Sequence, residues 1–409
     1  MEEKKYWFSI LPHVYYVQKN GKALLYDTQT GENIHTKNVQ IINLLELMHD
    51  RKNLGVIEVD KAICNQVDDF IKESVSKNIC SITEVIEKQS KPIQLMPILN
   101  LQRDIEKLKK EDGRSLGEGV LHYLSDVTIY LNHSCTINCK DCENYLSQFF
   151  HCSKSFTAEN IDFDFLKQFL KQLAFTFIRR LAITGGNIFH YPHFSELIAF
   201  LREEKIISLF GVHYKNIDWG KISLLCDFPL EIFVTFPLEV EIVFGMDSLS
   251  KQRNVKYVFE ITSVENYNQA EALVSKYSIE NYAYKPFYNG KNQCFFRNNI
   301  HVTKDDIFSD IIPQRIIFAH QKLNTNFFGK IHLFPNGDIK AHPLKEVLGN
   351  CKLEPLVKIL EKEMVTNTAW RIIREKKPCN ECLYQFLCPS PSDYEWVMSK
   401  NNLCNININ

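Results

Sequence analysis

Residues 127–142 read VTIYLNHSCTINCKDC, a short apolar strand that leads directly into three cysteines. Cys135, Cys139 and Cys142 follow the strand in a C-x3-C-x2-C spacing. The carboxyl ends of strands are where α/β sheets and barrels hold their ligands. Three thiolates at this spacing can surround one compact centre, whereas a structural zinc ion requires a fourth protein ligand. The spacing therefore favours a four-iron cluster with one iron left open for a small molecule.

The sequence after this loop alternates between strand and helix patterns. Apolar runs of strand length occur at 180–184, 206–212, 230–235, 255–261 and 282–287. Amphipathic patterns of helix length separate them, at 161–177, 194–203, 219–225 and in the stretch after Asn266. Strands that alternate with helices indicate parallel pairing, so we expect an α/β fold built as a parallel sheet or a partial barrel.

Composition and charge restrict what the chain can bind. Its 409 residues include 48 basic and 49 acidic side chains, which gives a formal net charge of -1. A nucleic-acid-binding surface usually shows as a basic excess or a basic run, and neither occurs, so we expect no nucleic-acid partner. No apolar stretch reaches the roughly 18–20 residues of a membrane span, and no signal peptide is evident. We therefore expect a cytoplasmic protein with no membrane contact.

The 13 cysteines are many for such a chain. A disulfide framework is not expected, because the number is odd and the chain is long. A second group, Cys379, Cys382, Cys388 and Cys404, supplies four thiolates, which are enough to enclose a metal centre completely. The remaining cysteines are scattered, and we interpret them as small buried apolar side chains.

The N-terminal part of the chain has its own pattern. Strand-like segments at 6–17 and 22–26 are joined across Lys19-Asn20-Gly21, a hairpin signal, and helical spacing of apolar residues follows. We expect a small winged-helix-like domain over residues 1–95. Peptide recognition and simple dimerisation or packing are both open to such a domain.

The C-terminal part begins with a second hairpin signal, Pro335-Asn336-Gly337, and ends in the cysteine-rich segment. Together these patterns divide the chain into four expected regions, namely a winged-helix-like domain at 1–95, a linker at 96–123, an α/β domain at 124–322 and a cysteine-rich domain at 323–409.

A C-x3-C-x2-C loop after the first strand, followed by a strand that ends in Gly185-Gly186, resembles the radical-SAM superfamily. The resemblance implies a partial (β/α) barrel and a 4Fe-4S cluster on Cys135, Cys139 and Cys142, with S-adenosylmethionine (SAM) chelating the open iron. Reductive cleavage of SAM then gives a 5′-deoxyadenosyl radical that abstracts hydrogen. The family's Gly-Gly-Glu motif reads Gly185-Gly186-Asn187, whose amide oxygen can accept a hydrogen bond from the SAM amine without charge assistance. A zinc loop or a chance group of thiols is the alternative.

The C-terminal group, C-x2-C-x5-C with a later cysteine, resembles the SPASM extension of peptide-modifying radical-SAM enzymes. The segments Phe334-Pro-Asn-Gly337-Asp338 and Leu348-Gly-Asn350, and then Trp370, agree with it. The resemblance implies that these four cysteines hold an auxiliary 4Fe-4S cluster. A second auxiliary set is incomplete, because His342 and Ser392 stand where the family has cysteines. We predict one auxiliary cluster, with a structural zinc site as the alternative.

The whole chain is similar to the pseudo-radical-SAM/SPASM proteins of GG-type Bacteroidales peptide-maturation systems. The opening Tyr6-Trp-Phe-Ser-Ile-Leu-Pro12, the segment Leu25-Tyr26-Asp27 and the C-terminal pattern carry this similarity. In such systems a leader peptide adds a strand to a sheet edge of the N-terminal domain. The resemblance therefore implies a precursor peptide with a leader as the partner.

Two hypotheses from different classes follow. The first is a radical-SAM enzyme that modifies a ribosomally synthesised precursor peptide. The second is a degenerate member that binds the peptide and presents it to an active radical-SAM partner enzyme. The intact three-cysteine loop favours the enzyme, which we expect, whereas Asn187 and the incomplete second auxiliary set favour the binding protein. A zinc-stapled protein without redox chemistry is a third interpretation.

Overall fold

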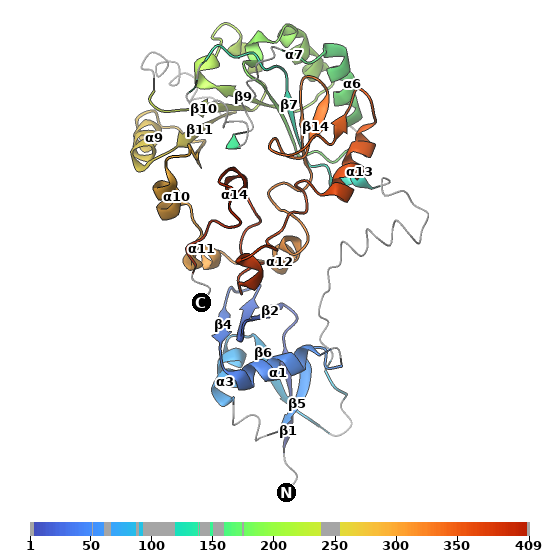
Figure 1. Cartoon of the computed structure of the whole chain (residues 1–409), viewed down its shortest axis with the longest axis vertical. Coiled ribbons are helices and arrows are strands. Elements are labelled where there is room, and N and C mark those ends of the chain that lie inside the picture. Colours follow the sequence, from blue (N-terminus) through green and yellow to red (C-terminus); the bar gives the residue numbers. More distant parts are fainter. Residues whose placement is uncertain are drawn as a thin grey trace.

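The computed structural model describes residues 4–50, 52–60, 67–86, 90–92, 119–137, 139, 148–149, 159–173, 176–238 and 254–406. Over these residues the chain has a mixed α/β fold (Figure 1). A small N-terminal module lies at one end and a large α/β body at the other, and C-terminal segments lie between them (Figure 1). Most of the expected linker, residues 96–118, is outside the described part.

The N-terminal module contains two small antiparallel sheets. The strand order is β5-β1-β6 in one sheet and β2-β3-β4 in the other. Their elements are β1 (Lys5–Ile10), β2 (Val14–Lys19), β3 (Lys22–Asp27), β4 (Asn33–Thr36), α1 (Val39–His49), β5 (Val56–Asp60), α3 (Asp68–Ser76) and β6 (Cys80–Glu84). The module has a core of its own, which includes Phe8, Leu45 and Met48, each with none of its surface exposed. Strands β4, β5 and β6 were not expected, because segments of four or five residues give little periodic signal.

The hairpin expected at Lys19-Asn20-Gly21 is confirmed. Lys19 and Lys22 pair at the ends of β2 and β3. Asn20 and Gly21 between them have φ angles of 50° and 68°. Two positive φ angles in a two-residue loop are those of the tight turn that matches the twist of the strands, and Asn-Gly is the pair best suited to it.

The large sheet contains nine strands, in the order β12-β11-β10-β9-β8-β7-β13-β14-β15. Strands β7 to β12 are parallel neighbours in chain order, so the expected parallel α/β pattern is confirmed. These strands are β7 (Asp126–Tyr130), β8 (Arg180–Thr184), β9 (Leu209–His213), β10 (Leu230–Val234), β11 (Val255–Ile261) and β12 (Tyr282–Pro286). The connecting elements are η1 (Val120–Tyr123), α6 (Phe163–Leu173), η2 (Ile188–His190), α7 (Phe194–Glu203), η3 (Tyr214–Asn216), η4 (Ile222–Leu225) and α9 (Val264–Lys276).

One expected helix, at 219–225, is shorter than predicted. The structure has only the 3-10 turn η4 there, preceded by a turn at Asp218. The Asp218 carboxylate accepts hydrogen bonds from the backbone N–H groups of Gly220 and Lys221, at 2.9 and 3.3 Å. Such local side-chain bonds compete with helix formation, which explains the difference.

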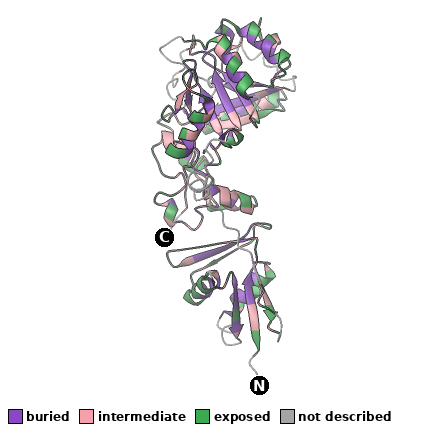
Figure 2. Cartoon of the chain, turned by 90° about the vertical axis from the view of Figure 1, so that its right-hand side faces the viewer, coloured by how far each residue is buried: buried purple, intermediate pink, exposed green. Residues whose placement is uncertain are grey.

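The two faces of the parallel sheet carry different side chains. Because alternate residues of a strand point to opposite faces, Val127 and Ile129 of β7 join the main core. The other face carries polar and aromatic side chains, including the buried Thr128, Tyr130, Glu260 and His332 and the half-buried Glu231. Buried residues are concentrated along these strands (Figure 2). The second face, called the inner face below, is mixed, because Phe233 and Val258 of an apolar cluster also lie on it.

The C-terminal part extends the same sheet. β13 (Lys330–Leu333) pairs in parallel with β7, and β14 (Asp338–Lys340) and β15 (Gly349–Asn350) continue antiparallel. The sheet thus crosses the expected boundary at residue 322, and the division into domains stays a proposal. The remaining elements are α10 (Gln293–Asn299), α11 (Lys304–Phe308), α12 (Gln314–His320), α13 (Leu356–Thr366), η5 (Cys379–Glu381) and α14 (Asp393–Val397).

The module and the body share a small apolar core. Leu24 and Tyr26 of β3 pack with Ile307, Ile317 and Leu387. The Tyr26 hydroxyl also accepts a hydrogen bond of 2.8 Å from the backbone N–H of Ile312. This core fixes the module against the C-terminal segments.

Candidate functional site

The loop that follows β7 carries the first cysteine group. Cys135 and Cys139 are both partly buried, and Cys142 lies outside the described residues. Cys139 packs against an apolar cluster that includes Phe149 and Phe233, on the inner face of the sheet. The loop therefore lies where the carboxyl ends of the parallel strands meet the polar face.

Gly185 and Gly186 let this loop lie directly on the end of β8. A Cβ atom on Gly186 would be 2.3 Å from the carbonyl oxygen of Ser134, the residue before Cys135. A Cβ atom on Gly185 would be 2.9 Å from the carbonyl oxygen of Asn132. Only glycine permits backbone segments to approach this closely. The Gly-Gly pair therefore sets the position of the cysteine loop.

Asn132 and Asn187 join the ends of β7 and β8. The Asn132 side chain donates to the Asn187 carbonyl at 2.8 Å and accepts from the Asn187 N–H at 3.2 Å. The side-chain oxygen of Asn187 accepts from the backbone N–H of Phe189 at 3.0 Å, so it caps η2. The oxygen that we expected to contact the SAM amine already has this local partner, and one further lone pair is left to it.

Asn216, at the end of η3 after β9, is a site residue that sequence analysis missed. Its side-chain amide donates to the sulfur of Cys135 at 3.6 Å and to the carbonyl of Gly186 at 2.9 Å. It is buried, with 5% of its surface exposed. An asparagine shortly after the carboxyl end of a parallel strand was the available signal, although many loops contain one.

Charged side chains line part of the inner face. Glu231 of β10 pairs with Arg180 of β8 at 3.3 Å and with Lys256 of β11 at 3.4 Å. Lys285 of β12 donates to the carbonyl of Gln148. Burial lowers the pKa of the Lys285 ammonium, and the nearby Asp393 carboxylate opposes that change. This face can therefore hold polar groups of a ligand in a partly dehydrated setting.

Two buried histidines, His332 and His342, lie beside the sheet. The His332 ring shares a hydrogen bond of 3.1 Å with the Tyr130 hydroxyl. Burial lowers the pKa of His332 to about 3 and that of His342 to about 2. Both rings are therefore neutral near pH 7.

His342 and Ser392, the two residues that leave the second auxiliary cysteine set incomplete, have structural roles here. The His342 ring is enclosed edge-on by Phe327 and Trp396, with ring centres 4.8 and 4.7 Å away. Ser392 caps α14 in a reciprocal capping box with Glu395. Both side chains are thus occupied by packing and capping of the C-terminal segment.

The four C-terminal cysteines lie near one another. Cys379 and Cys382 are buried, and Cys388 and Cys404 are partly buried. Burial raises the pKa of the Cys379, Cys382 and Cys388 thiols, that of Cys388 to about 12. The Arg374 guanidinium opposes this change at Cys379 and Cys388, and the neighbouring thiols add to it. In the described ranges, no three His, Cys, Asp or Glu side chains form a group already arranged to hold a metal ion. Four soft thiol donors in mutual electrostatic contact nevertheless fit the chemistry of a zinc ion or an iron–sulfur cluster.

Cys404 reaches this group through a backbone contact distant in sequence. Val302 and Cys404 form an isolated parallel bridge. The backbone N–H of Val302 donates to Leu403 at 3.0 Å, and that of Asn405 donates to Val302 at 2.9 Å. The side-chain amide of Asn402 lies 3.1 Å from the Cys404 sulfur. The bridge thus places the Cys404 thiol near those of Cys379, Cys382 and Cys388.

Arg374 supplies positive charge to the same group. Its guanidinium is buried, pairs with the buried carboxylate of Glu395 at 2.8 Å, and lies 3.9 Å from the sulfur of Cys379. Burial opposes the charged form, but Glu395 and the thiols of Cys379 and Cys388 raise the pKa of the guanidinium overall. A retained cation beside buried thiols favours their ionised form.

Comparisons with known proteins add the following. Residues 116–225 match a family model described as a 4Fe-4S single cluster domain. No curated protein sequence matches the chain. Among solved structures, Streptococcus suis SuiB bound to S-adenosylmethionine shares 11% identity at a TM-score of 0.47, covering 98% of this chain and 99% of that one. SuiB bound to its precursor peptide SuiA shares 12% identity at a TM-score of 0.48, with the same coverage.

No helix among the residues described is both long and apolar enough to cross a lipid bilayer.

Proposed function

We propose that the chain is a radical-SAM enzyme that modifies a ribosomally synthesised precursor peptide. Cys135, Cys139 and Cys142 are the proposed cluster ligands. A 4Fe-4S cluster held by these thiolates would supply the electron that cleaves SAM reductively, and hydrogen abstraction from the peptide is the chemistry that this would make available. A cytoplasmic setting is part of the proposal, because a reducing compartment keeps such thiols available.

The observation that carries the proposal is the position of the Cys135 loop. It lies on the Gly185-Gly186 backbone at the carboxyl edge of a parallel sheet, with Asn216 bonded to the Cys135 sulfur. It also falls within the segment that matches the 4Fe-4S single cluster model. A loop held in this way keeps a cluster fixed relative to the polar inner face on which a substrate would lie.

The chain's own residues have separate proposed roles. The N–H group of Asn216 stabilises the Cys135 thiolate by hydrogen bonding. Gly185, Gly186 and Asn187 are the proposed contacts to SAM. The apolar cluster around Phe233 excludes water near Cys139, which protects a radical from quenching.

The test is anaerobic reconstitution with iron and sulfide, followed by SAM and a strong reductant. We expect 5′-deoxyadenosine, measured by mass spectrometry, from the wild type and none from a variant with Cys135, Cys139 and Cys142 changed to Ala. A wild type that binds iron only through its C-terminal cysteines and makes no 5′-deoxyadenosine would contradict the enzyme.

We further propose that Cys379, Cys382, Cys388 and Cys404 hold one auxiliary 4Fe-4S cluster. Support comes from the closeness of the four thiols and from the cation of Arg374 beside them. Iron, zinc and acid-labile sulfide analysis of protein purified without oxygen tests this assignment. Zinc without sulfide in a protein lacking the first three cysteines would contradict it.

The second candidate is a degenerate protein that presents the peptide to an active radical-SAM partner enzyme. The capping role of the Asn187 side chain favours it, because that oxygen already accepts from Phe189. The 5′-deoxyadenosine assay separates the two candidates. Peptide binding without any SAM cleavage is expected of the second candidate.

The N-terminal module is the proposed binding site for the leader. In the part that the structure describes, β4 pairs only with β3, so its other edge is a candidate for strand addition by a peptide. Deleting the whole module would also remove Leu24 and Tyr26 and so expose their partners Ile307, Ile317 and Leu387 in the shared core. A proline at Asn33 is therefore the better test, because in the alternating β3–β4 ladder the Asn33 N–H points to the outer edge. We expect it to weaken leader binding while thermal stability is retained.

A further inference from the structure

The tip of the β2–β3 hairpin contacts the loop that carries three of the C-terminal cysteines. The ammonium of Lys19 donates to the carbonyl of Asn380 at 2.7 Å and to the side-chain oxygen of Gln385. The amide of Asn20 donates to the carbonyl of Glu381 at 3.4 Å. All three acceptors lie between Cys379 and Cys388, so the N-terminal module is hydrogen-bonded directly to this loop.

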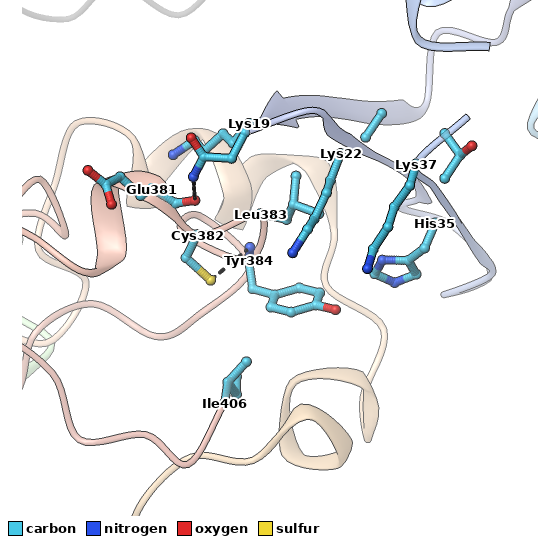
Figure 3. A pocket seen from close by; sticks show the side chains of 12 residues that line it. Lys19, Lys22, His35, Lys37, Glu381, Cys382, Leu383, Tyr384 and Ile406 are labelled. Atoms are coloured by element: carbon cyan, nitrogen blue, oxygen red, sulfur yellow. Dashed lines mark hydrogen bonds between the residues drawn. The ribbon is translucent and has the colours of Figure 1, made fainter. Parts of the chain in front are cut away.

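Lys19 lies in the same surface pocket as one of the thiols. A cavity of about 260 Å³ between the hairpin and the loop is lined by Lys19, Lys22, Cys382 and Tyr384, among others (Figure 3). The Lys19 ammonium is also 5.9 Å from the ring centre of Phe386. Burial lowers the pKa of Lys19, while the Cys382 and Cys379 thiols act in the opposite direction. The Lys19 ammonium and the thiols of Cys379 and Cys382 therefore interact electrostatically.

A metal-bound form of this site has a charge that must be balanced. Four thiolates around a divalent metal ion carry a net charge of about −2, and a partly buried charge is costly unless cations lie near it. Arg374 supplies one cation from within the C-terminal part, 3.9 Å from the Cys379 sulfur. Lys19 supplies a second cation, and it comes from the N-terminal module.

We propose that Lys19 is a positioning residue of the C-terminal cysteine site, contributed by the N-terminal module. It holds the loop through Asn380 and Gln385, and its charge stabilises the metal-bound thiolates. The iron–sulfur form of this inference rests on the auxiliary cluster proposed above. The charge argument applies to a zinc site as well. Docking of the N-terminal module would then affect the metal retention and the reduction potential of the C-terminal cysteine site.

The test uses the full chain with Cys135, Cys139 and Cys142 changed to Ala, so that the signal comes only from the C-terminal centre. Lys19→Gln removes the charge and keeps hydrogen-bonding groups, and Lys19→Arg keeps the charge. Lys22→Gln is the matched control, because Lys22 lines the same pocket. The measurements are metal and sulfide content, the rate of metal loss to a chelator, and the reduction potential from an EPR-monitored titration.

We expect Lys19→Gln to lose metal about 10-fold faster or more, the usual scale for groups that support metal ligands. We also expect its reduction potential to become more negative, because the added electron is no longer stabilised by the ammonium. Lys19→Arg and Lys22→Gln should behave like the parent. A purely structural role would not be rescued selectively by the charge-conserving variant.

Each alternative outcome has a distinct meaning. A cluster with the same potential and the same metal loss in Lys19→Gln and in the parent overturns the role of Lys19. Zinc in the parent overturns the auxiliary cluster, and the chelator rates then still decide the role of Lys19. A parent that binds neither zinc nor iron overturns both proposals.

Discussion

The side-chain amide of Asn216 donates a hydrogen bond to the sulfur of Cys135 at 3.6 Å, although the two residues are 81 positions apart in the chain. The same amide group also donates to the carbonyl of Gly186 at 2.9 Å. One side chain after β9 thus fixes the cysteine loop after β7 and the glycine pair after β8. The ends of three neighbouring strands are joined at the candidate site.

Asn216→Ala should reduce both cluster content and stability. It leaves the buried Gly186 carbonyl without this donor, which costs about 1–3 kcal/mol of unfolding free energy. Asn254→Ala is the control, because Asn254 also donates to two carbonyls, at 2.8 and 2.6 Å, but far from the loop. Urea unfolding and iron analysis should show destabilisation in both variants and iron loss at the first site in Asn216→Ala alone. Equal iron content in the two variants would contradict the role of Asn216.

Gly186→Ala should displace the cysteine loop. The new methyl group would meet the Ser134 carbonyl at 2.3 Å, and relief requires the backbone to move. Overpacking of this kind typically costs about 1–3 kcal/mol. Gly119→Ala, where a Cβ atom meets nothing within 4 Å in the described part, should be nearly neutral. Urea midpoints that match for the two variants would show that the close contact is not maintained in solution.

Glu363→Gln should destabilise the C-terminal part. The fully buried Glu363 carboxylate accepts from the backbone N–H groups of Thr368, Ala369 and Trp370, at 3.0, 2.9 and 2.8 Å. An amide offers only one acceptor oxygen, so part of this set is lost at a cost of about 1–3 kcal/mol. Glu361→Gln, whose partner Lys358 is exposed, should change the unfolding free energy by less than about 1 kcal/mol. A thermal or urea midpoint unchanged in Glu363→Gln would count against this role.

Stability should fall in acid partly through His342. Its folded-state pKa of about 2 is below the ordinary value of 6.5, so the folded state prefers the neutral ring. The resulting stabilisation is complete above about pH 6.5 and is lost as the pH falls toward the folded-state pKa, by about 1.4 kcal/mol per pH unit. His342→Phe should therefore show a shallower decline between pH 6 and 4 in urea titrations, relative to His122→Phe at an exposed position. Parallel pH profiles for the two variants would contradict the assignment.

Local pattern was sufficient to predict much of the fold. Strands β8 and β11 and helix α7 have the bounds expected from apolar periodicity, and both hairpins lie at their Asn-Gly signals. These features depend on neighbours in sequence, which is why sequence alone reveals them. The short strands of the module carry too few residues for a periodic signal.

Sequence analysis named the cysteines, the glycine pair and Asn187 as candidate site residues, and their roles stay predictions. Asn216 and Lys19 were missed because each acts on partners distant in the chain, and Lys19 lies 366 positions from Gln385. Nothing near Lys19 in sequence distinguishes it from an ordinary surface lysine of a hairpin. The capping role of Asn187 was likewise missed, because it depends on how the chain turns into η2.

The bridge between Val302 and Cys404 also makes the four thiols unequal in how they depend on the fold. Cys379, Cys382 and Cys388 lie within one short loop, whereas Cys404 keeps its place only while residues 403–405 stay paired with Val302. Local unfolding of that pairing would leave three thiols without the fourth, open to oxidation and to capture of the wrong metal.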